Sequence, residues 1–383
     1  MLKAETFTNG ATSPADSAIT ALAVAERHRT EVNLCGLATA VPEHTVSQEQ
    51  AKCSAREIFG ARTPLFRELE AVFDNSAISN RHICQPLEWF FESSGFSEKS
   101  KLFEEHAIAL ARQVSEKALG AAGLEPADID AIIVVSSTGV TTPSLDARLM
   151  NQMPFRSDTL RLPIFGLGCA GGVLGLTRAA QIAQSRPGSK CLLITLELCS
   201  LAFRYDRLTK SNIVATALFG DGAAAAVLST EGGSADLGVL GAGGEHCWPD
   251  TLNVMGWKVD SLGLDVIFHR RIPQIVEQDY GAALHGFMDG AGLAMTDVAR
   301  PCCHPGGAKV IAALEGVFDM THGELDAEWD VLRRFGNMSA PTVLFVLEEL
   351  VRRGHSGQTL LSSLGPGFTA AFQSLDLAGP AAA

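Results

Sequence analysis

The 383-residue sequence has no apolar run of about 18 residues, so no transmembrane helix is expected. Residues 1–30 are polar and rich in Ala, Ser and Thr, and they lack the apolar core of a signal peptide. We therefore expect residues 1–30 to form a loose extension ahead of the first strand, and we expect the protein to be cytoplasmic.

Metal-binding and disulfide motifs are also missing. The nine cysteines are scattered without paired spacing, no C-x-x-C or H-E-x-x-H motif occurs, and Cys302-Cys303-His304 is too tightly spaced for a zinc site. Reduced thiols without a bound metal are expected. Basic residues are scarce, because 30 Lys and Arg stand against 43 Asp and Glu. The net charge of −13 disfavours nucleic acid or anionic lipid as the main partner.

The pattern that is present alternates helices with strands. We expect helices over 101–123 and 173–185, and buried strands over 129–137 and 190–197. Such alternation is typical of α/β architecture. With 46% hydrophobic residues, the chain can bury a core large enough for two domains or for one duplicated domain.

The second half of the chain repeats short stretches of the first. Ala122-Gly123-Leu124 with Asp128-Ile129 reappears, 169 residues later, as Ala291-Gly292-Leu293 with Asp297-Val298. Gly168-Cys169 matches Gly336-Asn337, and Cys191-Leu192-Leu193 matches Thr359-Leu360-Leu361, both 168 residues later. Three matches in order at nearly one offset indicate two related halves, which we place at 31–238 and 239–383.

Cys169 lies where an apolar run breaks into glycines before a helix-periodic stretch begins. A thiol at such a strand-to-helix elbow faces the positive end of a helix, which favours the thiolate. Taken alone, a cysteine in an apolar segment is usually inert. The loop also satisfies the dinucleotide pattern G-x-G-x-x-G (166–171), and Glu197 closes the next strand. The mid-chain position and the cysteine in the turn weigh against a dinucleotide site.

Two downstream motifs supply partners for this thiol. They are Cys303-His304-Pro305-Gly306-Gly307 and Gly336-Asn337-Met338-Ser339. In isolation the histidine would cap a turn and the asparagine would cap a helix. Packing of the two halves about a pseudo-twofold axis would bring the helices that begin near Cys169 and Asn337 together, with His304 at the same end of the sheets. Cysteine, histidine and asparagine together are typical of thiol-based acyl chemistry.

These motifs, with Leu218-Phe219-Gly220-Asp221-Gly222 and Gly365-Pro366-Gly367-Phe368, resemble the type III polyketide synthases, the chalcone and stilbene synthase superfamily. The resemblance covers residues 32–375. It implies the thiolase fold, a five-layer αβαβα architecture with internal duplication, assembled as a homodimer. It also implies an acyltransferase that uses acyl-CoA and malonyl-CoA as substrates and needs neither metal nor redox cofactor.

The resemblance assigns a role to each member of the triad. Cys169 would carry the acyl chain, and His304, as an imidazolium, would lower the pKa of the thiol. N–H donors of His304 and Asn337 would hold the thioester oxygen of malonyl-CoA and stabilise the enolate left by loss of CO₂. The enolate would then attack the acyl group on Cys169, and the chain would grow by two carbons.

The resemblance also implies a set of substrate-binding residues. Phe219 and Phe268 match the two gatekeeper phenylalanines between the tunnel and the cavity, and Thr142 matches a residue that reaches across the dimer interface. Cys199 and Ala202 replace threonines of the plant enzymes, which implies a deeper and more apolar pocket. The full set expected to bind substrate is Phe219, Phe268, Cys199, Ala202, Ser137, Thr142, Gly365, Pro366 and Gly367.

The segment 255–259, Met-Gly-Trp-Lys-Val, resembles bacterial members that make alkylresorcinols or alkylpyrones from fatty acyl starters. We therefore expect malonyl-CoA to extend a fatty acyl starter, which is then cyclised. Plant enzymes hold the coenzyme A phosphates with basic residues at positions that correspond here to Glu68, Ala71 and Asn75, and only Arg67 and Arg81 lie nearby. A different grip on coenzyme A and delivery by an acyl carrier protein are both open.

Other functions stay open at this point. A ketoacyl-acyl carrier protein synthase III shares the fold and the triad but condenses once, and Pro305-Gly306-Gly307 replaces the Gln-Ala-Asn expected there. A Cys–His–Asn hydrolase, an NAD-binding oxidoreductase and an inactive scaffold are the remaining alternatives.

Overall fold

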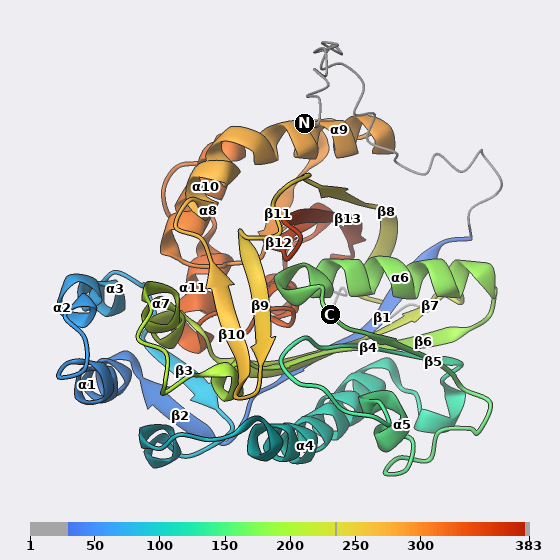
Figure 1. The fold of residues 1–383 in the computed structure, drawn as a ribbon. Coiled ribbons are helices and arrows are strands. Elements are labelled where there is room, and N and C mark those ends of the chain that lie inside the picture. The colour runs from blue at the N-terminus through green and yellow to red at the C-terminus, as the bar shows by residue number, and fades with distance from the viewer. Residues whose placement is uncertain (1–29, 234–235, 380–383) are drawn as a thin grey trace, which may run out of the picture.

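A nine-stranded sheet in the order β11-β12-β13-β8-β1-β7-β6-β4-β5 organises the computed structural model (Figure 1), which describes residues 30–233 and 236–379. The extension expected at 1–30 lies outside these ranges except for Thr30. The strands are β1 (Val32–Ala40), β4 (Ala131–Val135), β5 (Leu160–Ile164), β6 (Lys190–Leu198), β7 (Asp221–Ser229), β8 (Gly238–Cys247), β11 (Arg300–Cys303), β12 (Gly357–Gly365) and β13 (Thr369–Leu377).

The sheet consists of two equivalent halves. The strand order β4-β6-β7-β1 on one side mirrors β11-β12-β13-β8 on the other, and the halves meet through three residue pairs between β1 and β8. A helix precedes each of the matching strands β4 and β11. These helices, α4 (Phe96–Ala122) and α9 (Gly281–Ala291), end in the same way. Gly123 (φ 66°) and Gly292 (φ 68°) adopt the left-handed conformation that glycine tolerates best, and a short 3₁₀ turn follows each. The expected internal duplication is confirmed.

Helices cover both half-sheets and fill the space between them. Helices α6 (Gly171–Ser185) and α12 (Thr342–Arg352) share one core with strands of both half-sheets. Helix α4 packs on the outer face of the first half-sheet, while α9 and α10 (Ala308–Val317) pack on the outer face of the second. The result is the expected five-layer αβαβα arrangement, with α6 and α12 as the central layer. Figure 1 shows α6 between the two half-sheets.

Smaller elements surround these layers. A separate core forms among α1 (Gln48–Phe59), α2 (Leu65–Leu69), α3 (Ala71–Asp74) and α7 (Lys210–Leu218). The two-stranded sheets are β2 (His44–Ser47) with β3 (Asn80–Ile83), and β9 (Met255–Asp260) with β10 (Gly263–Phe268). The remaining helices are α5 (Leu145–Leu149), α8 (Ile272–Ile275) and α11 (Asp326–Phe335).

The sequence-based boundaries need small corrections. The helix expected at 101–123 begins five residues earlier at Phe96, and the strand expected at 129–137 is the shorter β4. Within 30–233 and 236–379, no helix combines the length and the apolar character that a membrane crossing requires. The cytoplasmic location stays a prediction.

Candidate active site

Cys169 lies in a 3₁₀ turn, Gly168–Ala170, between the loop that follows β5 and the start of α6. The hydroxyl oxygen of Ser137 accepts hydrogen bonds from the backbone N–H groups of Gly166 and Gly168, both at 3.1 Å. A Cβ atom on Gly168 would lie 2.6 Å from a ring carbon of Pro366, so this close approach requires glycine. Cys169 is therefore presented on a rigid elbow, and its Sγ lies 3.5 Å from the hydroxyl of Ser339.

Asn337 follows α11, and both its backbone and its side chain are held. Its N–H donates to Leu218 O at 2.9 Å, and its carbonyl accepts from Gly220 N–H at 3.0 Å. The side-chain Oδ1 accepts from Ser339 N–H at 2.8 Å, and Nδ2 donates to Gly306 O at 3.1 Å. One of the two Nδ2 protons therefore remains available for a ligand.

His304 lies at the end of β11 and is 5% exposed. Its backbone N–H donates a hydrogen bond to the carbonyl oxygen of Ser362 at 2.8 Å. The N–H of the preceding residue, Cys303, donates at 2.9 Å to the buried carboxylate of Glu328. Neither ring nitrogen of His304 has a hydrogen-bond partner among the residues that the structure describes. The backbone is fixed, while the imidazole is free to bind substrate.

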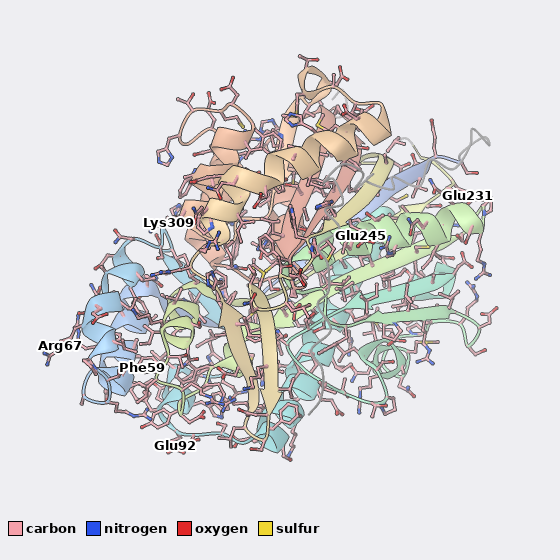
Figure 2. All side chains as sticks on the ribbon, turned by 45° about the horizontal axis from the view of Figure 1, so that its top comes forward. Phe59, Arg67, Glu92, Glu231, Glu245 and Lys309 are labelled. Atoms are coloured by element: carbon pink, nitrogen blue, oxygen red, sulfur yellow. The ribbon has the colours of Figure 1, made fainter. Side chains whose placement is uncertain are left out.

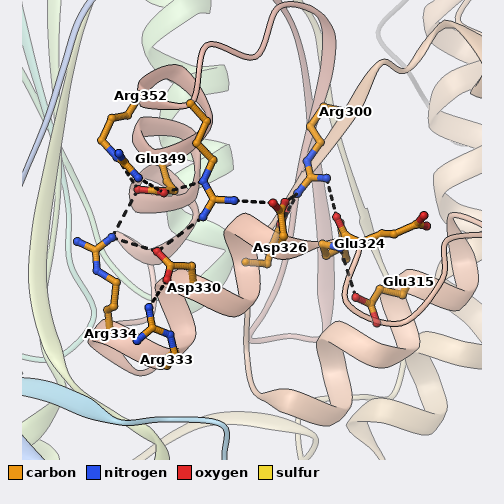
Figure 3. Close-up of polar contacts among 12 residues, drawn as sticks. Arg300, Glu315, Glu324, Asp326, Asp330, Arg333, Arg334, Glu349 and Arg352 are labelled. Carbon is orange, nitrogen blue, oxygen red and sulfur yellow. Dashed lines mark hydrogen bonds and ion pairs between the residues drawn. The ribbon is translucent and has the colours of Figure 1, made fainter.

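An ion network behind the site ties together the elements that carry His304 and Asn337 (Figure 3). Arg300 of β11 contacts Asp326 of α11 at 2.7 Å, and Arg353, after α12, contacts Asp326 at 2.6 Å and Glu349 at 2.7 Å. Exposed pairs of this kind contribute little individually. Glu349 is buried, so breaking its contacts would leave a charged carboxylate without a partner inside the protein. The network therefore links α11 to α12.

The three predicted catalytic residues line one small cavity. Phe268 and Met255 of the β9–β10 hairpin close one side of it, and α8 and α10 contribute further apolar side chains. The structure therefore brings Cys169, His304 and Asn337 together from three separate segments, as the duplication predicted.

Burial decides the protonation of this site. It raises the pKa of the Cys169 thiol to about 12, although a hydrogen bond with Ser339 acts in the opposite direction. Burial also lowers the pKa of His304 to about 3. Both shifts favour the neutral thiol and the neutral imidazole in the ligand-free site. The resting imidazolium expected from the sequence therefore stays a prediction, which burial of the His304 ring opposes.

A buried carboxylate lies close to the elbow. Glu197 accepts hydrogen bonds from Ser137 N–H at 3.0 Å and from the Thr138 hydroxyl at 2.7 Å. Burial raises its pKa to about 7, and its charge would further raise the pKa of Cys169. The sequence analysis connected Glu197 with the dinucleotide pattern, and no motif placed its carboxylate behind the thiol.

A second cavity, with a mainly apolar lining, adjoins the catalytic one. Cys199, Ala202 and Phe219 line it, together with side chains of α1 and α7. Phe219 and Phe268 form an edge-to-face pair with centroids 6.4 Å apart, and Trp257 lies 6.3 Å from Phe219. Because Phe268 faces the catalytic cavity and Phe219 the apolar one, these aromatic rings stand between the two spaces.

Five other expected substrate residues line neither cavity. Ser137 is buried and shapes the Cys169 elbow, as described above. Thr142 lines a groove on the outer surface. Residues 365–367 pack against the elbow, since a Cβ on Gly365 would lie 2.5 Å from Leu167 O. Ser339, which the quoted motif contained without a role, is the contact to Cys169 that the sequence analysis missed.

Neither of the basic residues expected near the coenzyme A phosphates faces the catalytic cavity. Arg81 is 3% exposed and donates to Thr216 O and Phe219 O at the C-terminal end of α7, where a cation complements the helix dipole. Arg67 extends outward from α2 (Figure 2). The delivery of the starter by coenzyme A or by an acyl carrier protein stays open.

Comparisons with known proteins cover most of the chain. Residues 20–232 match the profile of the chalcone and stilbene synthases, N-terminal domain, and residues 240–373 match that of the C-terminal domain. The two profiles meet between β7 and β8, where the two halves of the fold join.

Individual relatives are similar over nearly their whole length. A putative chalcone synthase of Bacillus subtilis (strain 168) is 35% identical over 350 residues, which are 88% of this chain and 96% of the relative. A 1,3,6,8-tetrahydroxynaphthalene synthase of Streptomyces peucetius is 36% identical over 375 residues, with 93% and 97% covered. The crystal structure of the Streptomyces coelicolor A3(2) enzyme, described as a bacterial type III polyketide synthase, superposes with a TM-score of 0.86 at 30% identity. That match covers 91% of this chain and all of the other.

Proposed function

The chain belongs to the chalcone and stilbene synthase family of type III polyketide synthases, and we propose that it extends a fatty acyl starter with malonyl-CoA and cyclises the product to a resorcinol or a pyrone. Membership makes it an acyl-transferring, condensing enzyme with the thiolase fold. The observation that carries the fatty starter is the apolar cavity beside Cys199 and Ala202.

Cys169 is the proposed acyl carrier, since it contributes the single thiol among the residues lining the catalytic cavity. His304 acts as the general base for the Cys169 thiol, because both side chains line the catalytic cavity. It takes the Cys169 proton as the sulfur attacks the starter thioester. A C–S bond to Cys169 forms, and coenzyme A leaves with the proton from His304.

Decarboxylation then uses the two free donors of the site. The second Nδ2 proton of Asn337 and a ring N–H of His304 donate to the thioester oxygen of bound malonyl-CoA. Loss of CO₂ leaves an enolate, whose charge these buried donors stabilise more strongly than water would. The enolate carbon bonds to the acyl carbon, and the C–S bond to Cys169 breaks.

The apolar cavity suits an alkyl tail. It is lined largely by aliphatic and aromatic side chains, and each methylene that it buries contributes about 0.8 kcal/mol. Cys199 lines the apolar cavity and lies near Cys169, whose charge would raise the pKa of the Cys199 thiol. An untailed product such as 1,3,6,8-tetrahydroxynaphthalene, which the names of relatives raise, would leave this cavity unused.

A homodimer is part of the proposal. Val140 and Phe165 are 52% and 58% exposed, and they lie near Thr142 on the outer face of the first half-sheet. Exposed apolar side chains at one place are typical of a covered surface. Native mass spectrometry of the full chain measures its oligomeric state directly.

The chemistry is tested by incubating the enzyme with malonyl-CoA and acyl-CoA starters of two to about sixteen carbons, followed by mass analysis of the products. Intact-protein mass spectrometry should show an acyl adduct on the wild type and none on Cys169→Ala. Cys247→Ala, which removes an exposed thiol, should keep the adduct. An adduct on Cys169→Ala would assign the nucleophile elsewhere. Parallel reactions with acyl carrier protein thioesters decide which carrier delivers the starter.

A further inference from the structure

The hairpin formed by β9 and β10 is a wall of both cavities. Trp257 and Val266 line the apolar cavity, and Met255 and Phe268 line the catalytic one. The two strands pair with each other and with no other strand of the described chain (Figure 1). The position of this wall is therefore not set by the hydrogen bonds of the main sheet.

An ion cluster, which we call the hairpin clamp, holds the hairpin near its turn. It consists of Arg204 and Arg207 with Asp260 of β9 and Asp265 of β10. Arg204 binds both oxygens of Asp260, at 2.9 and 3.2 Å. Arg207 contacts Asp260 at 2.6 Å and Asp265 at 3.2 Å. The guanidinium contacts lower the pKa of Asp260, so the cluster stays ionised at neutral pH.

The arginines of the clamp are mounted on a fixed segment. The Nδ2 group of Asn212 donates to Arg204 O at 2.8 Å and to Arg207 O at 2.9 Å, and the ammonium of Lys99 donates to Phe203 O. This segment directly continues the 3₁₀ turn Cys199–Ala202, which also lines the apolar cavity and packs against β10. The clamp thus joins two neighbouring parts of the cavity wall.

We propose that Arg204 and Asp260 are positioning residues that fix the distance between the hairpin and the Cys199–Ala202 turn, and so set which acyl chain lengths the enzyme accepts. The inference rests on the proposed function, because it concerns the starter bound in the apolar cavity. Arg204 is 1% exposed. Removing a charged group from water is costly, so an ion pair that involves a buried arginine often stabilises a fold less than apolar residues of the same volume would. A two-pronged guanidinium–carboxylate contact does, however, define a geometry.

Two matched substitutions separate positioning from general stabilisation. Asp260→Asn weakens the link between Arg204 and the hairpin. Asp206→Asn weakens a contact to the same arginine, 2.7 Å in the wild type, but Asp206 belongs to the segment of Arg204 and does not hold the hairpin. Each variant therefore removes one negative charge that contacts Arg204, but only Asp260→Asn weakens the attachment of the hairpin.

The measurements are kcat/KM for a series of acyl-CoA lengths, malonyl-CoA decarboxylation without starter, and the thermal midpoint. In Asp260→Asn, the preference for the best starter over one four carbons shorter should fall about tenfold, roughly the effect of two buried methylenes. The rate of decarboxylation should stay within about twofold of the wild type, because the substitution leaves the triad untouched. A tenfold change in this rate would correspond to about 1.36 kcal/mol of activation free energy. Asp206→Asn should keep the wild-type preference.

An equal loss of kcat/KM for all starters in Asp260→Asn, or an equal shift in Asp206→Asn, would overturn the inference while leaving the proposed function intact. Wild-type enzyme that turns over no acyl-CoA would instead overturn the proposed function. If Asp260→Asn does not fold, Asp265→Asn replaces it, because Asp265 has a single clamp contact. The same loss of preference, smaller in size, is then expected, and unchanged selectivity would count against the inference.

Discussion

Replacing Ala202 with phenylalanine should turn a long-chain enzyme into a short-chain one. Ala202 is almost fully buried, lies three residues beyond Cys199 and lines the apolar cavity. A phenyl ring at this position would occupy space close to the acylated Cys169, while leaving Cys169, His304 and Asn337 unchanged. The substitution therefore tests the cavity without altering the chemistry.

The size of the effect follows from the methylenes that lose their site. If the ring excludes four methylenes that the wild type buries, about 3 kcal/mol of binding is lost. This corresponds to roughly a hundredfold decrease in kcat/KM for long starters. Short starters that end before Ala202 should keep kcat/KM within about twofold, because they bury nothing where the ring now lies.

The assay is the ratio of kcat/KM between long and short acyl-CoA starters, measured for the wild type, Ala202→Phe and Ser54→Phe. Ser54, on α1, lines the same cavity from another element. A phenyl ring at this position would fill the part of the cavity that α1 lines, away from Cys199. We therefore expect kcat/KM to fall only for the longest starters. A thermal midpoint for each variant shows whether overpacking, which typically costs about 1–3 kcal/mol, has destabilised the fold.

A wild-type optimum at acetyl-CoA or at an aromatic starter, unchanged by Ala202→Phe, would refute the reasoning about the cavity. In that case the apolar space is filled by side-chain rearrangement when substrate binds. The assignment of the triad would be unaffected, because it depends on the other cavity.

Three further predictions concern the catalytic cavity and the buried residues that support it. Asn337→Ala and His304→Ala should each slow malonyl-CoA decarboxylation about 10²- to 10³-fold, measured as CO₂ release, and near-normal rates would remove these residues from the mechanism. Since burial raises the pKa of Cys169 to about 12, its alkylation by iodoacetamide should speed up about tenfold per pH unit from pH 6 to 9. A plateau above pH 7 would instead show a thiolate–imidazolium pair. Glu328→Ala should lower the free energy of unfolding by about 3 kcal/mol in denaturant titrations, because it leaves Arg300 without its buried partner, and Glu328→Gln should cost less.

Local chemistry made much of the fold and the site predictable. Gly123 and Gly292 end their helices in the left-handed conformation, so a repeat in the sequence became a repeat in the backbone. The elbow at Cys169 was predictable for the same reason, because glycines permit its tight turn. Convergence of Cys169, His304 and Asn337 followed once the two halves were recognised as equivalent.

Features that depend on distant partners could not be predicted. The sequence placed Arg81 near the expected coenzyme A phosphates, whereas the carbonyls that it binds at the end of α7 lie 135 and 138 residues away. The hairpin clamp joins arginines and aspartates more than 50 residues apart. The burial of His304, which lowers its pKa, was equally unpredictable, since it depends on packing that no short motif reports.

The burial of the catalytic cavity contributes directly to its reactivity. A low-dielectric cavity disfavours a standing ion pair, so it raises the pKa of Cys169 and lowers that of His304. The same low dielectric strengthens every hydrogen bond to a charge that forms inside the cavity. The donors on His304 and Asn337 therefore interact weakly with a resting thioester and strongly with an enolate, and this difference between ground state and transition state accelerates decarboxylation. A site that held a permanent imidazolium would bind the negatively charged malonyl carboxylate more tightly, and it would thereby stabilise the group that has to leave as neutral CO₂.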